Sequence, residues 1–193
     1  LVLANIDVCY GPTKVLSNVH LELHRSQSVG IVGRSGAGKS TLVDVICGLI
    51  DPANGQVKLD DVAYEDLDKK LLRSMLGYVT QEPVVLDETI THNISLWEVS
   101  KPDGRIRQVA GEAAALEFIE SRDAGFDSET GERGKNLSGG QRQRVSIARE
   151  LYREPKILIF DEATSALDAE SSRTILKTID ELQGKQTMII ITQ

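Results

Sequence analysis

The apolar residues of the first eighty positions recur mostly at the spacing of β-strands. Residues 1–10 (LVLANIDVCY) are β-like, and residues 18–23 (NVHLEL) alternate apolar with polar side chains as a half-buried strand does. Residues 28–33 (SVGIVG) form a short apolar run, which predicts a strand covered on both faces. The stretches 55–61 (GQVKLDD) and 76–81 (LGYVTQ) predict two more strands.

Helical spacing of the apolar residues begins at Lys39 and continues to the Asp51-Pro52 pair, which ends the element. Further stretches with helical periodicity lie at 69–75, 87–96, 105–121 and 139–152. Residues 155–163 (PKILIFDEA), 168–182 and 186–191 then predict a strand, an amphipathic helix and a last strand. This late alternation predicts a parallel sheet with helices on both faces, and therefore an α/β fold.

The composition of the 193 residues, with 40% hydrophobic and 26% charged residues, is ordinary for a globular protein. The net charge is −7 and there is no long basic run, which argues against binding to nucleic acid. No stretch approaches the roughly 18 apolar residues that cross a bilayer. The chain begins without Met and stops within an apolar run, so we expect a domain of a longer polypeptide.

The two cysteines lack metal-ligand spacing and CxxC spacing. Cys9 and Cys47 both fall within apolar patterns, which predicts reduced core residues of a cytosolic protein. The three histidines, His20, His24 and His92, are predicted to be surface residues.

A glycine-rich segment, GRSGAGKS, lies between a predicted strand and a predicted helix. Its glycines, among them Gly33 and Gly38, let successive backbone N–H groups turn toward phosphate oxygens. Lys39 can reach the β- and γ-phosphates of a nucleotide, and the Ser40 hydroxyl can ligate Mg²⁺. A glycine-rich turn with a chance lysine is the alternative, and the flanking strand and helix argue against it.

The run ILIFDE places Asp161 and Glu162 at the carboxyl end of a predicted buried strand, where α/β sheets bind ligands. Asp161 is suited to hold Mg²⁺ directly or through water, and Glu162 to orient or deprotonate an attacking water. The pair alone could equally cap the following helix. Its combination with the phosphate loop favours a nucleotide-hydrolysing site.

A second phosphate cradle, LSGGQ, precedes the predicted helix at 139–152. With the phosphate loop it makes the whole chain resemble the nucleotide-binding domain of an ATP-binding cassette (ABC) protein. GRSGAGKST resembles the family's Walker A motif, ILIFDE its Walker B motif, LSGGQ its signature, and SALD (165–168) its D-loop. The resemblance implies a P-loop NTPase (RecA-like) core with a mostly parallel sheet and an antiparallel β subdomain in 1–83 and 153–193, and an inserted helical subdomain in 84–152.

The resemblance also assigns roles to residues. It implies nucleotide binding by Tyr10, Gly33, Arg34, Ser35, Gly36, Ala37, Gly38, Lys39, Ser40 and Thr41. It implies catalytic roles for Glu162, Gln81 and Lys39, magnesium binding by Ser40, Gln81 and Asp161, and a D-loop role for Asp168. The signature residues, Leu137, Ser138, Gly139, Gly140 and Gln141, act in family members on the ATP of a partner subunit, which explains why one chain carries two cradles.

The cofactors implied are ATP and Mg²⁺, and the partners are a second nucleotide-binding domain and a transmembrane domain. The GERG loop (131–134) and the DETITHNIS stretch resemble exporters, whose membrane domain precedes this one in the same polypeptide. We therefore expect a membrane domain N-terminal to Leu1, a location at the cytoplasmic face of a bacterial inner membrane, and no nucleic-acid partner.

Gln193 stands where exporters generally place a switch histidine that contacts the γ-phosphate. Either the histidine lies further on, or the switch is substituted as in members with one weakened site. An alternative function is thus an ATP-binding switch half of a heterodimeric transporter. A soluble ATPase of the DNA-repair or chromosome-organising kind is disfavoured, because residues 40–137 carry no long coiled coil.

Overall fold

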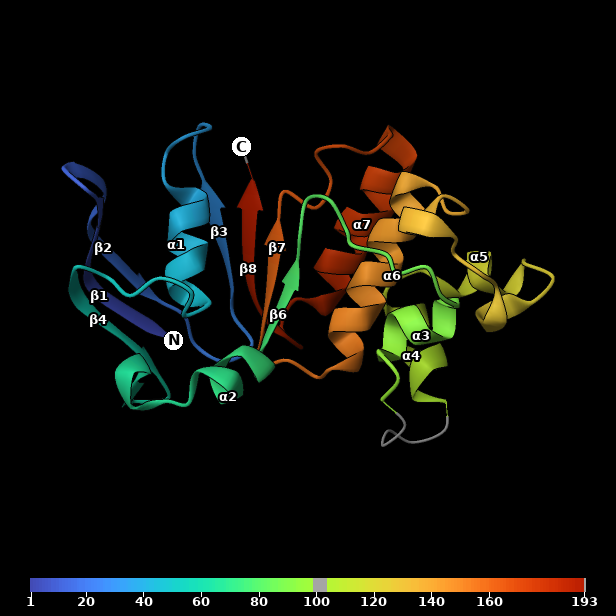
Figure 1. Cartoon of the computed structure of the whole chain (residues 1–193), viewed down its shortest axis with the longest axis horizontal. Helices are drawn as coiled ribbons and strands as arrows, with labels where there is room; N and C mark the ends of the chain where they lie inside the picture. Colours follow the sequence, from blue (N-terminus) through green and yellow to red (C-terminus); the bar gives the residue numbers. More distant parts are fainter. Residues whose placement is uncertain (99–103, 193) are drawn as a thin grey trace.

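The computed structural model of the chain describes residues 1–98 and 104–192. Two four-stranded sheets organise it, and they stand side by side in Figure 1. The antiparallel sheet has the order β2-β1-β4-β5, with β1 Val2–Tyr10, β2 Thr13–Glu22, β4 Asn54–Leu59 and β5 Val62–Ala63. The parallel sheet has the order β3-β8-β7-β6, with β3 Ser28–Val32, β8 Thr187–Thr192, β7 Ile157–Asp161 and β6 Leu76–Val79.

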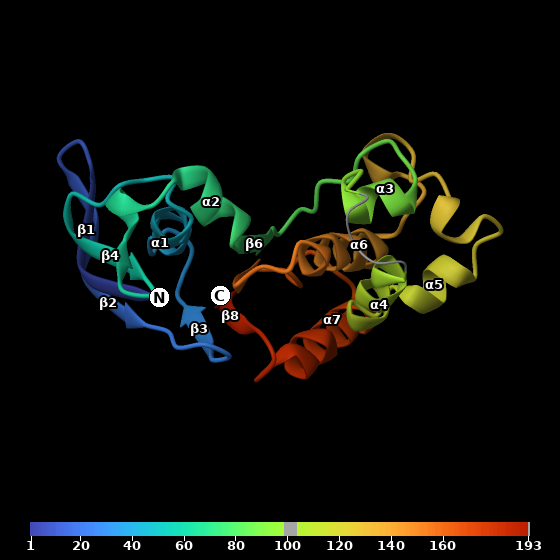
Figure 2. The same cartoon turned by 90° about the horizontal axis from the view of Figure 1, so that it is seen from below.

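The helices lie on both sides of the parallel sheet, as the sequence predicts. On the side of the antiparallel sheet are α1 Lys39–Ile46, the 3₁₀ helix η1 Tyr64–Asp66 and α2 Lys69–Ser74. On the other side are α3 Ile90–Ser95, α4 Arg105–Glu112, α5 Leu116–Glu120, the 3₁₀ helices η2 Gly125–Asp127 and η3 Glu132–Gly134, α6 Gly139–Tyr152 and α7 Ala169–Leu182. Figure 2 shows these two lobes from below, joined through the parallel sheet.

Strand β7 shows how one apolar run serves two cores. Leu158 and Phe160 belong to the cluster that includes α6 and α7, whereas Ile157 and Ile159 belong to the cluster that includes α1 and the antiparallel sheet. Successive side chains of a strand point to opposite faces, so a strand covered on both sides must be apolar throughout. Asp161, two positions after Ile159, ends the strand on the side of α1.

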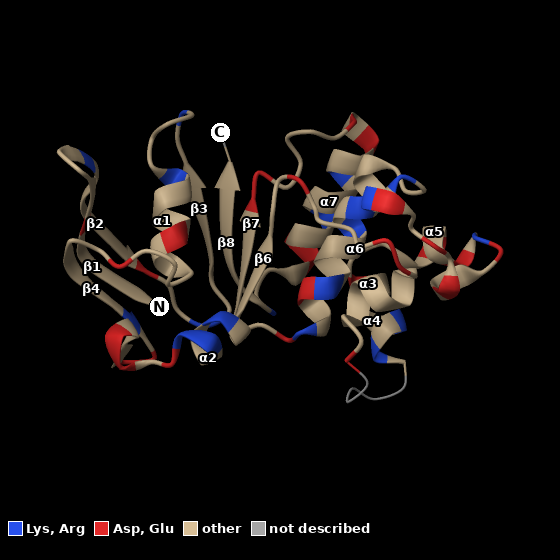
Figure 3. Ribbon diagram, viewed as in Figure 1, with Lys and Arg blue, Asp and Glu red and all other residues tan. Residues whose placement is uncertain are grey.

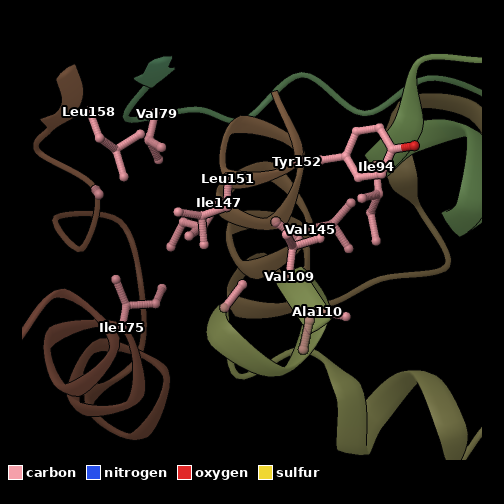
Figure 4. Packing of buried hydrophobic residues seen from close by; sticks show 14 of the residues in the cluster. Val79, Ile94, Val109, Ala110, Val145, Ile147, Leu151, Tyr152, Leu158 and Ile175 are labelled. Atoms are coloured by element: carbon pink, nitrogen blue, oxygen red, sulfur yellow. The ribbon is translucent and has the colours of Figure 1, made fainter. Parts of the chain in front are cut away.

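The long helix α6 lies at the centre of the apolar cluster that includes α6 and α7. Figure 4 shows its side chains between the sheet and α7 on one side and α3 and α4 on the other. The labelled residues come from five elements besides α6 itself: Val79, Leu158, Ile175, Ile94, Val109 and Ala110 pack around Val145, Ile147, Leu151 and Tyr152. Removing this apolar surface from water is the main stabilising contribution to the lobe.

A buried polar network also holds this lobe. The Arg149 guanidinium of α6 donates to the Asn93 carbonyl (2.6 Å), the Asn93 side-chain oxygen (2.9 Å) and the Val84 carbonyl (2.7 Å). Asn93 accepts from the N–H of Leu86 (2.8 Å) and donates to the Leu86 carbonyl (3.0 Å). Because Asn93 is fully buried, the network pins the segment after Gln81 to α3 and to the signature helix.

Two sequence predictions need correction. Strand β3 is not covered on both faces: it is an edge strand of the described sheet, and Val32 is 72% exposed while Ile31 packs on the core. Cys9 is exposed. Side chains alternate between the two faces of a strand, and because Val8 points into the core, Cys9 points outward. The helical periodicity predicted for 105–121 is confirmed: the stretch forms two helices, separated at Ala114, whose φ is 52°.

The remaining predictions for these residue types hold. Cys47 is buried. His20 and His24 are exposed and His92 is partly exposed, as expected of surface residues. Gln193 lies outside the described residues.

Candidate nucleotide site

The loop between β3 and α1 has the backbone shape of a phosphate cradle. Gly36 and Gly38 have φ values of 78° and 89°, which side chains rarely adopt. A Cβ on Gly38 would also lie 2.9 Å from the Leu16 side chain of β2. Helix α1 begins directly after Gly38 with no side-chain cap, so its first N–H groups and the positive end of its dipole are left for an anion.

Lys39 connects the loop to the end of β7. Its ammonium donates to the Gly33 carbonyl at 2.6 Å and lies 3.6 Å from the Glu162 carboxylate. Both side chains are largely buried, at 10% and 14% exposed. Figure 3 shows Lys or Arg (blue) at the start of α1 and Asp or Glu (red) at the end of β7, at the same edge of the parallel sheet.

One open hollow joins these groups. Its lining consists of Val15, Arg34, Ser35, Gly36, Gly38, Lys39, Ser40, Thr41, Asp161 and Glu162. The phosphate loop and the two carboxylates, which are more than a hundred positions apart in sequence, thus meet at the carboxyl ends of β3 and β7. This is the edge at which open α/β sheets bind ligands.

Tyr78 of β6 does not line the hollow, but it contacts Asp161, and the sequence analysis missed this contact. Its hydroxyl donates to Asp161 Oδ2 at 2.7 Å. Burial, followed by the hydrogen bond to Asp161, raises the pKa of the Tyr78 hydroxyl above its ordinary value, so it remains a donor at neutral pH. The sequence GYVTQ gave no sign of this contact, which depends on the pairing of β6 with β7.

The donor set suits a hard cation held together with phosphates. Ser40 and Asp161, which line the hollow, offer a hydroxyl and a carboxylate oxygen. No group of three or more His, Cys, Asp or Glu residues suited to a metal occurs in residues 1–98 and 104–192. Mg²⁺ is commonly held by one or two side chains, waters and substrate phosphates rather than by a protein cage, so the residues present fit it.

Gln81 lies just after β6 and lines an adjoining hollow with Glu162, Thr164 and Ser165. Gln81 and Glu162, two of the predicted catalytic residues, therefore line the same hollow. Tyr10 is 51% exposed at the end of β1 and is not part of either lining. Its predicted stacking on adenine stays a prediction.

The signature residues Leu137–Gln141 lie in the other lobe, at the start of α6, and line neither hollow. Ser138 caps the helix: its hydroxyl accepts from the Gln141 N–H (3.2 Å), and the Gln141 side chain accepts from the Ser138 N–H (3.0 Å). This capping box orders the N-terminal turn of a fourteen-residue helix. The arrangement presents a serine hydroxyl and a helix start at the surface, because Ser138 is exposed.

The start of α7 is packed tightly against the signature. A Cβ on Gly140 would lie 2.3 Å from Ser171 Oγ and 2.6 Å from Ser171 Cβ. Asp168 caps α7 by accepting from the N–H groups of Ser171 (2.9 Å) and Glu170 (3.1 Å), and these donors hold the pKa of Asp168 below its ordinary value. The D-loop and the signature are therefore neighbours within one chain.

A larger hollow, of about 590 Å³, lies at the opposite edge of the parallel sheet. Its lining includes Ser26, Ile157 and Thr187, at the amino ends of β3, β7 and β8. It contains no glycine-rich loop and mixes acidic with basic side chains. Strand polarity favours the smaller hollow as the ligand site.

Fold and site together define a P-loop nucleotide-binding domain with a helical lobe. The family model described as "ABC transporter" matches residues 16–165, and the chain belongs to that family as its ATP-binding domain. In the part of the chain that the structure describes, no helix is long and apolar enough to cross a membrane.

The relatives are longer proteins. The chain is 41% identical over 187 residues to the ATP-dependent lipid A-core flippase of Desulfotalea psychrophila, and 42% identical over 190 residues to the heterocyst differentiation ATP-binding protein HepA of a Nostoc species. It is 43% identical over 189 residues to the leukotoxin translocation ATP-binding protein LktB of Mannheimia haemolytica. These matches cover 97–98% of the chain but only 33%, 31% and 27% of the relatives.

Among solved structures, a bacterial Atm1-family ABC exporter with ATP bound matches with a TM-score of 0.88 and 36% identity. The match covers 99% of this chain and 34% of that one. The predictions of an ABC ATP-binding domain and of a mixed α/β fold with parallel and antiparallel sheets are confirmed.

Proposed function

We propose that the chain is the ATP-hydrolysing domain of a transporter that exports or flips a substrate, and that it works as a dimer closed around ATP. The observation that carries the proposal is the meeting of Lys39, Asp161 and Glu162 at one hollow beside an uncapped helix start. Membership of the ABC transporter family makes ATP the nucleotide.

The residues at the hollow have separable roles in this proposal. The loop N–H groups and Lys39 bind the β- and γ-phosphates, and Ser40 and Asp161, with Gln81, hold Mg²⁺. Mg²⁺ held there would supply positive charge that offsets the negative charge developing on the phosphates. Glu162 accepts a proton from the attacking water, a role that is supported by its place in the same hollow as Lys39 and Ser40.

The second half of the ATP site comes from a partner subunit. Ser138, Gly139 and Gly140 line neither hollow of their own chain, yet Ser138 offers an exposed hydroxyl at a helix start, which is a favourable environment for a γ-phosphate. In a head-to-tail dimer, each ATP contacts the phosphate loop of one subunit and the signature of the other. ATP then joins the subunits and its hydrolysis releases them.

A transmembrane domain in the same polypeptide is the partner that converts this cycle into transport. The relatives, which include a flippase and a translocation protein, are about three times longer than the chain, and the solved relative is an exporter. We place the domain at the cytoplasmic face of a bacterial inner membrane, with the GERG loop facing the membrane domain. The route and the substrate are set by that other domain.

Two alternatives make different predictions. A switch half of a heterodimeric transporter would bind ATP and hydrolyse it slowly; Gln193 motivates it, and Gln193→His should then accelerate phosphate release. If Gln193→His releases phosphate no faster than the wild type, the argument for a switch half is removed. An ATPase of the DNA-repair kind is disfavoured by the short helical lobe, in which the described α-helices before α6, namely α3, α4 and α5, have at most eight residues.

The test of hydrolysis is Glu162→Gln in the full-length protein. Loss of a general base lowers turnover by roughly 10²- to 10⁴-fold while ATP affinity stays close to wild type. Steady-state phosphate release and nucleotide binding give the two numbers. Unchanged turnover would refute the role of Glu162.

The test of the shared site is Ser138→Arg, which places a bulky cation where the partner's ATP would sit. We expect hydrolysis to be lost while ATP binding to the isolated monomer is retained, because the monomer's own phosphate loop is untouched. Loss of monomer binding as well would show that residues 138–140 serve their own chain's nucleotide, contrary to the proposal.

A further inference from the structure

The contact between Tyr78 and Asp161 follows from strand register. Tyr78 of β6 pairs with Ile159 of β7, and Asp161 lies two positions further along β7. Residues two apart on a strand share a face, so Tyr78 and Asp161 project from the same side of the sheet. This is the side of α1, since Tyr78 and Ile159 both belong to the α1 cluster.

Tyr78 is held in place at both ends. Its N–H donates to the Glu150 carboxylate of α6 at 3.3 Å, and that carboxylate accepts from Arg153 at 2.8 Å. Its half-buried ring packs against the α1 cluster, and its hydroxyl reaches Asp161 Oδ2 at 2.7 Å. The hydroxyl is therefore a fixed donor rather than a mobile one.

A second tyrosine, Tyr64, offers a comparison, because its hydroxyl donates to a backbone carbonyl rather than to a carboxylate. Tyr64 packs against the same cluster and donates to a backbone carbonyl, that of Ile46, at 2.9 Å. Tyr78 instead donates to a carboxylate that lines the nucleotide hollow. In residues 1–98 and 104–192, Tyr78 is the one side chain that donates to Asp161, and it engages Oδ2 while Oδ1 has no protein donor.

We propose that Tyr78 is a positioning residue: it fixes the plane of the Asp161 carboxylate so that Oδ1 is presented to a divalent cation or to one of its waters. The inference rests on the proposed role of Asp161 in holding Mg²⁺. Outer hydrogen-bond partners orient metal ligands generally, and their loss weakens metal binding even though they do not touch the metal.

The test compares Tyr78→Phe with Tyr64→Phe and Asp161→Asn in the full-length protein. Two readouts are needed: the Mg²⁺ concentration that gives half-maximal ATP hydrolysis, and the Mg²⁺ dependence of binding of a fluorescent non-hydrolysable ATP analogue. Tyr78→Phe should raise both half-saturating Mg²⁺ concentrations by about 10-fold, the lower end of the range for lost outer partners. The affinity for the analogue in EDTA and the hydrolysis rate at saturating Mg²⁺ should stay near wild type.

Tyr64→Phe removes another part-buried hydroxyl, one that donates to a backbone carbonyl, and should leave both Mg²⁺ dependences unchanged. If Tyr78→Phe matches wild type while Asp161→Asn shifts the Mg²⁺ dependence, the inference fails and the proposed function stands. A lower half-saturating concentration in Tyr78→Phe would also overturn it, because the hydroxyl would then compete with the cation. If Asp161→Asn has no effect, the role of Asp161 and the inference fail together.

Tyr78→Met provides a second variant should Tyr78→Phe prove unstable. Methionine fills apolar space adaptably and carries no donor. It should show the same 10-fold shift, roughly, in the Mg²⁺ dependence of analogue binding. A wild-type dependence in this variant would overturn the inference.

Discussion

Gly140→Ala tests whether the second signature glycine is required by packing within its own chain. The added Cβ would lie 2.6 Å from Ser171 Cβ and 2.3 Å from Ser171 Oγ. Carbon atoms in contact stay about 3.5–4.0 Å apart, so α6 and the start of α7 would have to separate by about 1 Å. The hydroxyl can rotate away, but the Ser171 Cβ cannot.

The expected cost combines two opposing effects. Overpacking of this kind costs about 1–3 kcal/mol, and replacing glycine by alanine in a helix returns up to about 1 kcal/mol. We therefore expect Gly140→Ala to lower the free energy of unfolding by about 1–2 kcal/mol. For a domain of this size this corresponds to a fall in Tm of roughly 2–8 °C.

The assay is urea unfolding of the 193-residue chain and of a double-mutant cycle with Ser171→Gly, which removes both clashing atoms. In the Ser171→Gly background, the Gly140→Ala change should be neutral or stabilising. Gly139→Ala is the matched control, because its Cβ would meet only side-chain ends, the nearest being Leu167 Cδ2 at 3.2 Å. An equal cost of Gly140→Ala in both backgrounds would refute the packing explanation.

Two other predictions concern buried groups. Asn93→Ala should lower the free energy of unfolding by about 2–4 kcal/mol in the same urea titration, because one Arg149 N–H group and the Leu86 N–H both lose the Asn93 side-chain oxygen as their acceptor. A loss below about 1 kcal/mol would mean that water replaces the amide. Burial, with a smaller effect of Asp44, raises the pKa of the Cys47 thiol to about 11. Iodoacetamide at pH 8, followed by mass spectrometry, should therefore modify exposed Cys9 in the native chain and Cys47 only after unfolding, and equal rates would contradict the burial of Cys47.

Much of the site could be predicted from sequence because its chemistry is local. The Gly36 and Gly38 backbone, the start of α1 at Lys39 and the position of Asp161 at the end of an apolar strand all follow from neighbouring residues. The combination of the phosphate loop with Asp161 and Glu162 then favoured one nucleotide-hydrolysing site, and the resemblance implied a role for each residue. The fold class followed from the alternation of strand and helix late in the chain.

What the sequence alone could not determine depends on how distant elements meet. The bond from Tyr78 to Asp161 requires the register of β6 with β7, and the contact of Gly140 with Ser171 requires the crossing of α6 and α7. The exposure of Cys9 requires knowing which face of β1 is buried. Side-chain period fixes which residues share a face, whereas only tertiary packing decides which face meets water and which atoms approach across it.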